Sequence, residues 1–209
     1  MEIYKTDKLD LSDVADDLDP PKPRDNGRWH VSNLLESAQL ITKGDIRYAG
    51  GNEVPDFVRT LGHMGRIWEA AADAHITKWA AERGGTYISN AVMEKDDIVA
   101  SLDGIMMMPE VTEPEMPESV LMVVEIKLRF ARSTDIPFRH QQQVLSYCSM
   151  LNTNLVCYVD AHIASNPPEA FGFIRFIKFT EREIEENWQM LTATKEYLES
   201  KGCGPENPK

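Results

Sequence analysis

An acid and a base stand two residues apart inside an apolar stretch of the sequence. Glu125 and Lys127 belong to the run Val-Val-Glu-Ile-Lys-Leu, and the β-branched residues around them predict a strand over 120–130. Successive side chains of a strand point to opposite faces, so Glu125 and Lys127 project from the same face. Because an unpaired buried charge is costly, this pair needs either a partner or a chemical role.

Asp103 supplies a second carboxylate for such a role. It lies in Ser-Leu-Asp-Gly-Ile, near the end of a strand predicted over 98–107. On an adjacent strand, Asp103 and Glu125 can share a hard divalent cation, and Lys127 can hold or activate the water beside it. These residues form the minimum set for metal-assisted hydrolysis of a phosphodiester. The alternative is a structural ion pair between Glu125 and Lys127, and this reading weakens as further polar residues join the set.

Two helical segments extend the set. In Gly65-Arg-Ile-Trp-Glu69, the glycine would allow close approach of a phosphate or a backbone, and Glu69 can reach the metal site as a further ligand. In Gln143-Val-Leu-Ser-Tyr147, an amide and a phenol one helical turn apart can orient a carboxylate, the lysine or a phosphate. The simpler alternatives are a helix-surface role for Glu69 and a core aromatic role for Tyr147.

Four motifs over about residues 30–150 resemble those of the PD-(D/E)xK nuclease superfamily, in its RecB-like, lambda-exonuclease-like and Cas4-like branch. In chain order they are Gly65-x-x-x-Glu69, Asp103, Glu125-x-Lys127 and Gln143-x-x-x-Tyr147. The resemblance implies a restriction-endonuclease-like sandwich, with a central mixed β-sheet flanked by helices.

The resemblance also implies a role for each motif residue. Asp103, Glu125 and the Ile126 carbonyl would bind Mg²⁺ or Mn²⁺, as two ions, and Glu69 would contribute from the metal's other side. Lys127 would serve the nucleophilic water, and Gln143 and Tyr147 would support the site. Many RecB-like members have a histidine at the position of Glu69, so the glutamate favours the phage-exonuclease type. The cysteine cluster of the iron–sulfur nucleases in this branch has no counterpart in this sequence.

A basic segment follows the metal strand and is the expected DNA contact. Residues 127–140 carry a net charge of +3 in a chain of net charge −12. Arg129, Arg132 and Arg139 are therefore predicted to contact phosphates, because lysine and arginine supply most of the affinity for a nucleic-acid backbone. Gly65 and Arg66 are predicted to hold the terminal phosphate or a frayed strand.

The remaining pattern predicts an α/β order around these motifs, with residues 1–26 as a flexible acidic leader and 27–209 as a single nuclease domain. Helices are predicted from a Ser32 cap to Thr42, over 64–79 up to Gly84-Gly85, over 138–151, and from a Thr180–Glu183 capping box to Lys201. Strands are predicted over 86–92, 98–107, 120–130, 155–160 and 171–179. The order of elements is typical of helices packed around a mixed sheet.

Composition narrows the classes of function. The net charge of −12 and the pI near 4.9 argue against a nonspecific nucleic-acid coat and against a binder of anionic membranes, which both need a basic surface. The three cysteines, Cys148, Cys157 and Cys203, lack paired spacing and are typical of reduced thiols. With no visible secretory signal, we expect a cytoplasmic protein, in the host cytoplasm if it is viral.

The function these residues favour is a divalent-metal-dependent deoxyribonuclease. The family likeness points to an exonuclease that resects DNA ends in recombination, repair or phage DNA metabolism. Its partners would be duplex ends or single strands, with a homo-oligomer and a recombination partner protein left open. Two alternatives stay open as well: a structure-specific or single-strand endonuclease, and a catalytically silent DNA-binding module of the same fold.

Overall fold

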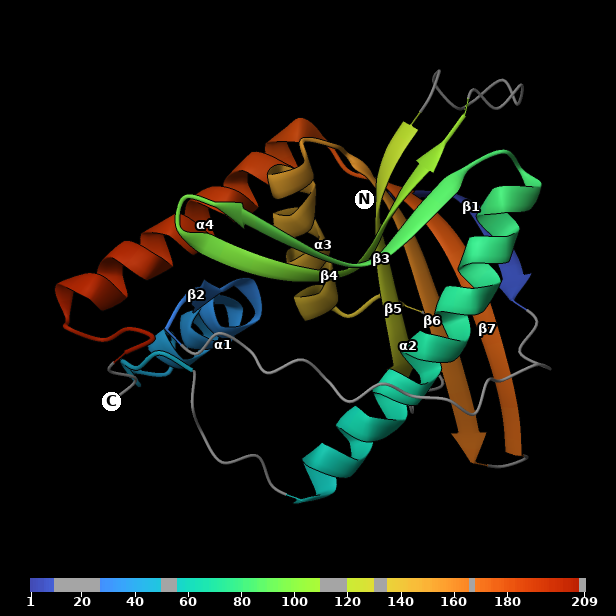
Figure 1. The fold of residues 1–209 in the computed structure, drawn as a ribbon. Coiled ribbons are helices and arrows are strands. Elements are labelled where there is room, and N and C mark those ends of the chain that lie inside the picture. Colours follow the sequence, from blue (N-terminus) through green and yellow to red (C-terminus); the bar gives the residue numbers. More distant parts are fainter. Residues whose placement is uncertain (10–26, 50–55, 110–119, 130–134, 166–167, 207–209) are drawn as a thin grey trace.

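The computed structural model describes residues 1–9, 27–49, 56–109, 120–129, 135–165 and 168–206. Its elements, in chain order, are β1 (Glu2–Leu9), β2 (Trp29–His30), α1 (Val31–Ile41), α2 (Asp56–Glu82), β3 (Thr86–Lys95), β4 (Ile98–Met108), β5 (Val120–Arg129), α3 (Phe138–Leu151), β6 (Leu155–Ser165), β7 (Pro168–Lys178) and α4 (Glu181–Ser200). Helix α2 lies on one side of the sheet, and α3 and α4 lie on the other (Figure 1).

The strands form one mixed sheet of seven. Its order is β1-β7-β6-β5-β4-β2, and β3 pairs with the other edge of β4. The pairs β5–β6 and β2–β4 are parallel, and the other pairs are antiparallel. A mixed sheet between helices confirms the fold class that the motifs implied.

Both faces of β5 are covered, which explains why its sequence is apolar without alternation. On one face, Val124 belongs to the same hydrophobic cluster as Trp68 and Ile76 of α2. On the other face, Val123 belongs to the cluster that contains Val144 of α3. Val123 and Val124 are fully buried. Any charged residue between such neighbours must therefore find its partners inside the protein.

One edge of β4 is divided between two neighbours. Strand β3 pairs with β4 from Ile98 to Met107, except at Asp103, so β5 and β2 must share the opposite edge. There, β5 pairs with Gly104–Met108 and β2 pairs with Ile98–Val99. The section from residue 100 to residue 103 lies between these two ladders. This interrupted edge is where the candidate site lies.

The β3–β4 hairpin is longer than the sequence pattern predicts. Asp96 and Asp97 form its turn with φ angles of 52° and 60°, the left-handed conformation that a two-residue hairpin turn requires. The turn reaches α4 (Figure 1). There the Trp188 indole donates to Asp96 Oδ2 at 2.9 Å. This contact joins the β3–β4 turn to α4.

Two local expectations are corrected. Residues Glu2–Leu9 differ from the expected flexible leader, because they form β1 and pair with β7; residues 10–26 lie outside the described residues. The cap expected at Ser32 is wrong: α1 begins at Val31, His30 is its N-cap, and no side chain caps the helix. The single nuclease domain over 27–209 stays a prediction.

The later helices follow the sequence closely. Helix α3 has the predicted bounds and ends at Asn152 in the left-handed conformation. The capping box of α4 is present, since Thr180 accepts from the Glu183 backbone and Glu183 accepts from the Thr180 backbone. Across the described ranges, no helix combines the length and hydrophobicity needed to cross a bilayer.

Candidate metal and catalytic site

Asp103 is joined directly to β5. The pairing of β4 with β5 ends at Gly104 and Val124. Beyond this pair, the backbone amide of Ile126, two residues after Val124, donates to Asp103 Oδ2 at 2.7 Å. The Asp103 carboxylate therefore accepts from a backbone amide of β5 at a point where β4 and β5 are no longer paired. This hydrogen bond places Asp103 against the Glu-x-Lys segment.

The three central residues of the motif meet at this point. The Lys127 ammonium forms an ion pair with Glu125 Oε1 and lies 3.6 Å from Asp103 Oδ2. Glu125 is completely buried, whereas the Asp103 and Lys127 side chains are 19% and 20% exposed. The site thus has one deep carboxylate and two charged groups at its solvent side.

The charges in the site shift one another's pKa. Burial, together with the charge of Asp103, raises the pKa of Glu125 to about 8, against the opposing effect of Lys127. Burial would lower the pKa of Lys127, but Asp103 and Glu125 outweigh this effect and hold it well above its ordinary value. Lys127 is therefore a charged hydrogen-bond donor, suited to orienting a water and not to removing its proton.

The donor atoms fit a hard divalent cation in part. Glu125 Oε2 has no hydrogen-bond partner within the described ranges, although it is buried. A buried carboxylate oxygen in this state suits Mg²⁺ or Mn²⁺, which prefer oxygen ligands. Among the residues with described side chains, however, no three His, Cys, Asp or Glu residues are grouped to hold a metal ion. Asp103 and Glu125 are brought together, and Glu69 does not complete a three-residue cluster with them.

Helix α3 supports the interrupted edge of β4. Gln143 donates to the Tyr147 hydroxyl at 2.6 Å, and that hydroxyl donates to the Ser101 carbonyl at 3.3 Å. Tyr147 is buried, and burial together with the charge of Glu125 raises its pKa above the usual range. The phenol stays neutral and positions the backbone two residues before Asp103. Tyr147 is therefore a core aromatic residue that also supports the site.

Helix α2 brings its motif to the same side. Glu69 is half-buried, and its charge contributes to the raised pKa of Glu125. A Cβ atom on Gly65 would meet no other atom within 4 Å, so the space beside this residue is open. The side chain of Arg66 lies outside the described residues. The expected contact of Gly65 and Arg66 with a DNA end stays a prediction.

Two residues that the sequence analysis missed also belong to this neighbourhood. The Tyr87 hydroxyl of β3 donates to Asp73 Oδ1 at 2.5 Å and lies 3.1 Å from the Asp103 carbonyl oxygen. Burial, together with the charge of Asp103, raises the pKa of Asp73 to about 6, against the opposing effect of this hydrogen bond. The sequence holds one indication of Asp73: it follows Glu69 by four residues, so the two lie on the same face of one helix.

Among the described residues of the basic segment, Arg129 does not lie on the surface. Arg129 is buried, forms an ion pair with Asp160, and donates to the Asp135 carbonyl at 2.5 Å. The guanidinium of Arg129 is therefore engaged inside the protein and is not available to a DNA phosphate. Arg139 is about half exposed and lies 3.3 Å from Glu36. Arg132 lies outside the described residues.

A histidine and a tyrosine line the same region. His140 Nδ1 lies 2.8 Å from the Tyr158 hydroxyl, and Tyr158 is the register partner of Glu125 across β5 and β6. Burial, with the charges of Lys127 and Arg129, lowers the pKa of His140 to about 4. The imidazole is therefore neutral at physiological pH.

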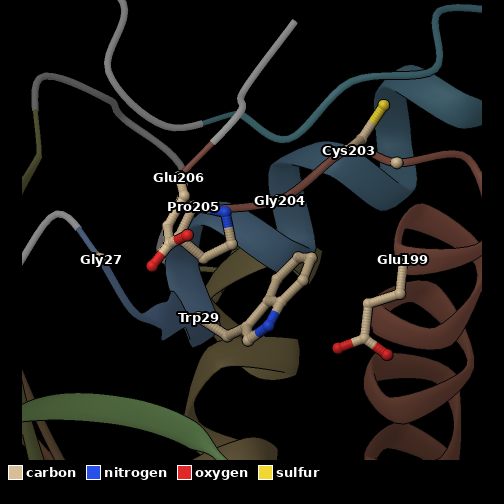
Figure 2. Close-up of a pocket in the computed structure, with 8 residues that line it drawn as sticks. Gly27, Trp29, Glu199, Cys203, Gly204, Pro205 and Glu206 are labelled. Atoms are coloured by element: carbon tan, nitrogen blue, oxygen red, sulfur yellow. The ribbon is translucent and has the colours of Figure 1, made fainter.

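A separate pocket lies between β2, the end of α4 and the C-terminal segment (Figure 2). The Trp29 ring faces Gly204 there, and Glu199 and Glu206 give the rim a negative charge. The pocket shares no residue with the site around Asp103. Because two carboxylates repel a phosphate, it does not suit a nucleic-acid backbone.

Comparisons with known proteins support the fold alone. No family model matches the chain, and no curated protein matches its sequence. Among solved structures, it is similar to the alkaline exonuclease LHK-Exo from Laribacter hongkongensis, with a TM-score of 0.50 and 12% identity over 84% of this chain and 89% of that one. A complex of LHK-Exo with dAMP gives a TM-score of 0.49 and 11% identity over the same shares. The likeness to LHK-Exo, with the mixed sheet between helices, gives the chain a restriction-endonuclease-like fold.

Proposed function

We propose that the protein is a divalent-metal-dependent DNA nuclease that degrades DNA from its ends. The observation that carries the proposal is the pairing of Asp103 with a fully buried Glu125 beside a charged Lys127. Two carboxylates and a lysine in this arrangement have little structural use, since an apolar strand would pack there at lower cost. The likeness of the fold to that of an alkaline exonuclease supports the same conclusion.

Each residue has a defined task in this proposal. Asp103, Glu125 and the Ile126 carbonyl would hold Mg²⁺ or Mn²⁺, as two ions, with Glu69 as a further ligand. A bound divalent cation lowers the pKa of a water and neutralises charge on the scissile phosphate. The Ile126 amide keeps Asp103 oriented, and the Lys127 ammonium orients the attacking water or donates to a phosphate oxygen. Gln143 and Tyr147 hold the Ser101 carbonyl and so keep β4 in place.

Two observations support a preference for DNA ends: the net negative charge of the chain, and the likeness of its fold to that of an alkaline exonuclease. A net charge of −12 repels duplex DNA at long range, so binding should depend on a local basic channel. Arg66, Arg132 and Arg139 are the residues we assign to phosphate contacts, with Gly65 leaving room for a strand. An end can enter such a channel more easily than the middle of a duplex, and the similar fold belongs to an alkaline exonuclease.

Digestion of matched linear and covalently closed circular DNA, labelled at the ends, tests this function. In Mg²⁺ or Mn²⁺ the linear duplex should shorten progressively from its termini and the circle should persist. The Asp103→Asn variant is the control, because it removes the charge and keeps the side-chain volume. Rapid nicking of the circle would select the endonuclease alternative. No cleavage and no Mn²⁺ binding by the wild type would select the silent DNA-binding module.

A further inference from the structure

We propose that Tyr87 and Asp73 are positioning residues that fix Asp103 relative to helix α2. The inference rests on the proposed metal-dependent function, because its purpose is to set the spacing between two metal-binding elements. It concerns residues outside the four motifs, on β3 and on the turn of α2 that follows Glu69.

The Tyr87 hydroxyl bridges two elements. It donates its single proton mainly to Asp73 Oδ1 at 2.5 Å and shares it with the main-chain oxygen of Asp103 at 3.1 Å. Both partners are half-buried, so water competes less with these contacts than at an open surface. One side chain thus joins α2 to the residue of β4 that carries the catalytic carboxylate.

Glycine at position 104 makes this bridge feasible. A Cβ atom there would lie 2.2 Å from Cε2 of the Tyr87 ring and 2.6 Å from its hydroxyl oxygen. Any side chain at this position would therefore push the ring away from Asp103. The Asp-Gly dipeptide of the motif consequently has a local reason: the residue after the carboxylate must leave room for Tyr87.

Asp103 is held at two points by these contacts. Tyr87 approaches its carbonyl from β3, and the Ile126 amide binds its carboxylate from β5. Asp73 follows Glu69 by one turn on the same face of α2, so anchoring Asp73 also sets where Glu69 stands. Its own Oδ1 is engaged by Tyr87, which favours a positioning role for Asp73 over direct metal binding.

The test combines two readouts on Tyr87→Phe, a variant that keeps the ring and removes the hydroxyl. The first is amide hydrogen exchange at Ile126 by NMR without metal, relative to Val124 in the same strand. The second is Mn²⁺ affinity by calorimetry. We expect exchange at Ile126 to accelerate about fivefold and the Mn²⁺ affinity to fall by a similar factor, the size of one net hydrogen bond.

Two further variants separate positioning from other roles. Asp73→Asn keeps an oxygen that accepts from Tyr87, so it should retain wild-type exchange and affinity, whereas Asp73→Ala should behave like Tyr87→Phe. Tyr48→Phe is the matched control: its hydroxyl accepts from the His30 amide at 3.0 Å and lies in the α1 region. It should leave the relative exchange at Ile126 and the Mn²⁺ affinity unchanged, even where its melting temperature falls.

The outcomes distinguish this inference from the proposed function. Unchanged exchange at Ile126 in Tyr87→Phe overturns the inference, whatever the wild type does with metal. Equal loss of Mn²⁺ affinity in Asp73→Asn and Asp73→Ala, with Ile126 unaffected, also overturns it and assigns Asp73 to the metal. A wild type that binds no Mn²⁺ contradicts the proposed function, while the exchange readout still decides whether Tyr87 holds Asp103.

Discussion

The Ile126 amide donates to Asp103 Oδ2 at 2.7 Å, just beyond Gly104 and Val124, where the pairing of β4 with β5 ends. This single hydrogen bond connects two motifs that stand 23 residues apart in the chain. It orients one carboxylate oxygen toward the strand and places the Asp103 side chain at the solvent side of the buried Glu125. Substitutions that keep or remove this hydrogen bond can therefore separate the structural role of Asp103 from its proposed role as a metal ligand.

Asp103→Asn and Asp103→Ala should both lose cleavage, by roughly a hundredfold or more, because both remove the charge that would hold the metal. The stability of the two variants should differ. Asparagine keeps an oxygen for the Ile126 amide, whereas alanine leaves that amide without its acceptor, at a cost of about 1–3 kcal/mol. Chemical denaturation without metal measures the difference. Metal-dependent cleavage above a few per cent of wild type in either variant would remove Asp103 from the site.

Glu125 should make the stability of the metal-free protein depend on pH. Its pKa is about 8 in the folded protein against an ordinary value of 4.5. A raised carboxyl pKa means that the folded state binds the proton more tightly than the unfolded state. The stabilisation is therefore complete below about pH 4.5 and is lost as pH rises through about 8. Melting temperatures across this range should fall in the wild type and change less in Glu125→Gln. Equal slopes for the two proteins would contradict the assignment.

The same protonation should control metal affinity. A proton on Glu125 competes with the divalent cation, so Mn²⁺ affinity should increase as pH rises toward and above about 8. Calorimetry in two buffers of different ionisation enthalpy should detect a proton released on binding near neutral pH. Binding without proton release, and with no pH dependence, would indicate that Glu125 is not a ligand.

Lys127→Met should separate catalysis from metal binding. Lys127 forms ion pairs with both carboxylates, so a cation entering the site competes with its ammonium group. Removing that group should leave Mn²⁺ affinity equal or higher, while turnover falls by roughly a hundredfold because the water loses its donor. The measurements are calorimetry and single-turnover cleavage. If the affinity falls as far as in Asp103→Asn, then Lys127 has a structural role instead.

The sequence predicted those parts of the site whose reason is local. Glu125 is conspicuous because its strand is otherwise apolar, and Gln143 and Tyr147 are one helical turn apart, so periodicity alone relates them. Tyr87 and Asp73 have no such signal, because their link to Asp103 exists only once β3 and α2 have packed. In β1, the alternation Tyr-Lys-Thr-Asp-Lys is polar, and its pairing with β7 reflects the sheet and not the strand's own residues.

For a related reason, the positive charge of the basic segment does not all lie on the surface. A run of positive residues predicts a surface only if each side chain reaches solvent, and Arg129 instead meets Asp160, which is 31 residues further along the chain. Asp160 is fully buried and also binds Arg175 at 3.4 Å. Charge counted along the sequence therefore overestimates the charge that DNA would meet. Among the described residues of the segment, Arg139 remains as an exposed cation.

Arg129→Met should therefore lower the stability of the protein, whereas Arg139→Ala should weaken DNA binding. Loss of Arg129 leaves Asp160 buried with one arginine fewer, and breaking such a pair typically destabilises a protein by about 3–5 kcal/mol. Arg139 is about half exposed, so its loss should leave the free energy of unfolding nearly unchanged.

On DNA, Arg139→Ala should weaken binding equally for all sequences and reduce the salt dependence by about one phosphate contact. Denaturation and salt-titrated binding to a short duplex, with the Asp103→Asn protein to prevent cleavage, measure both effects. An unchanged salt slope in Arg139→Ala, or one that falls in a stably folded Arg129→Met, would place the DNA-binding surface elsewhere.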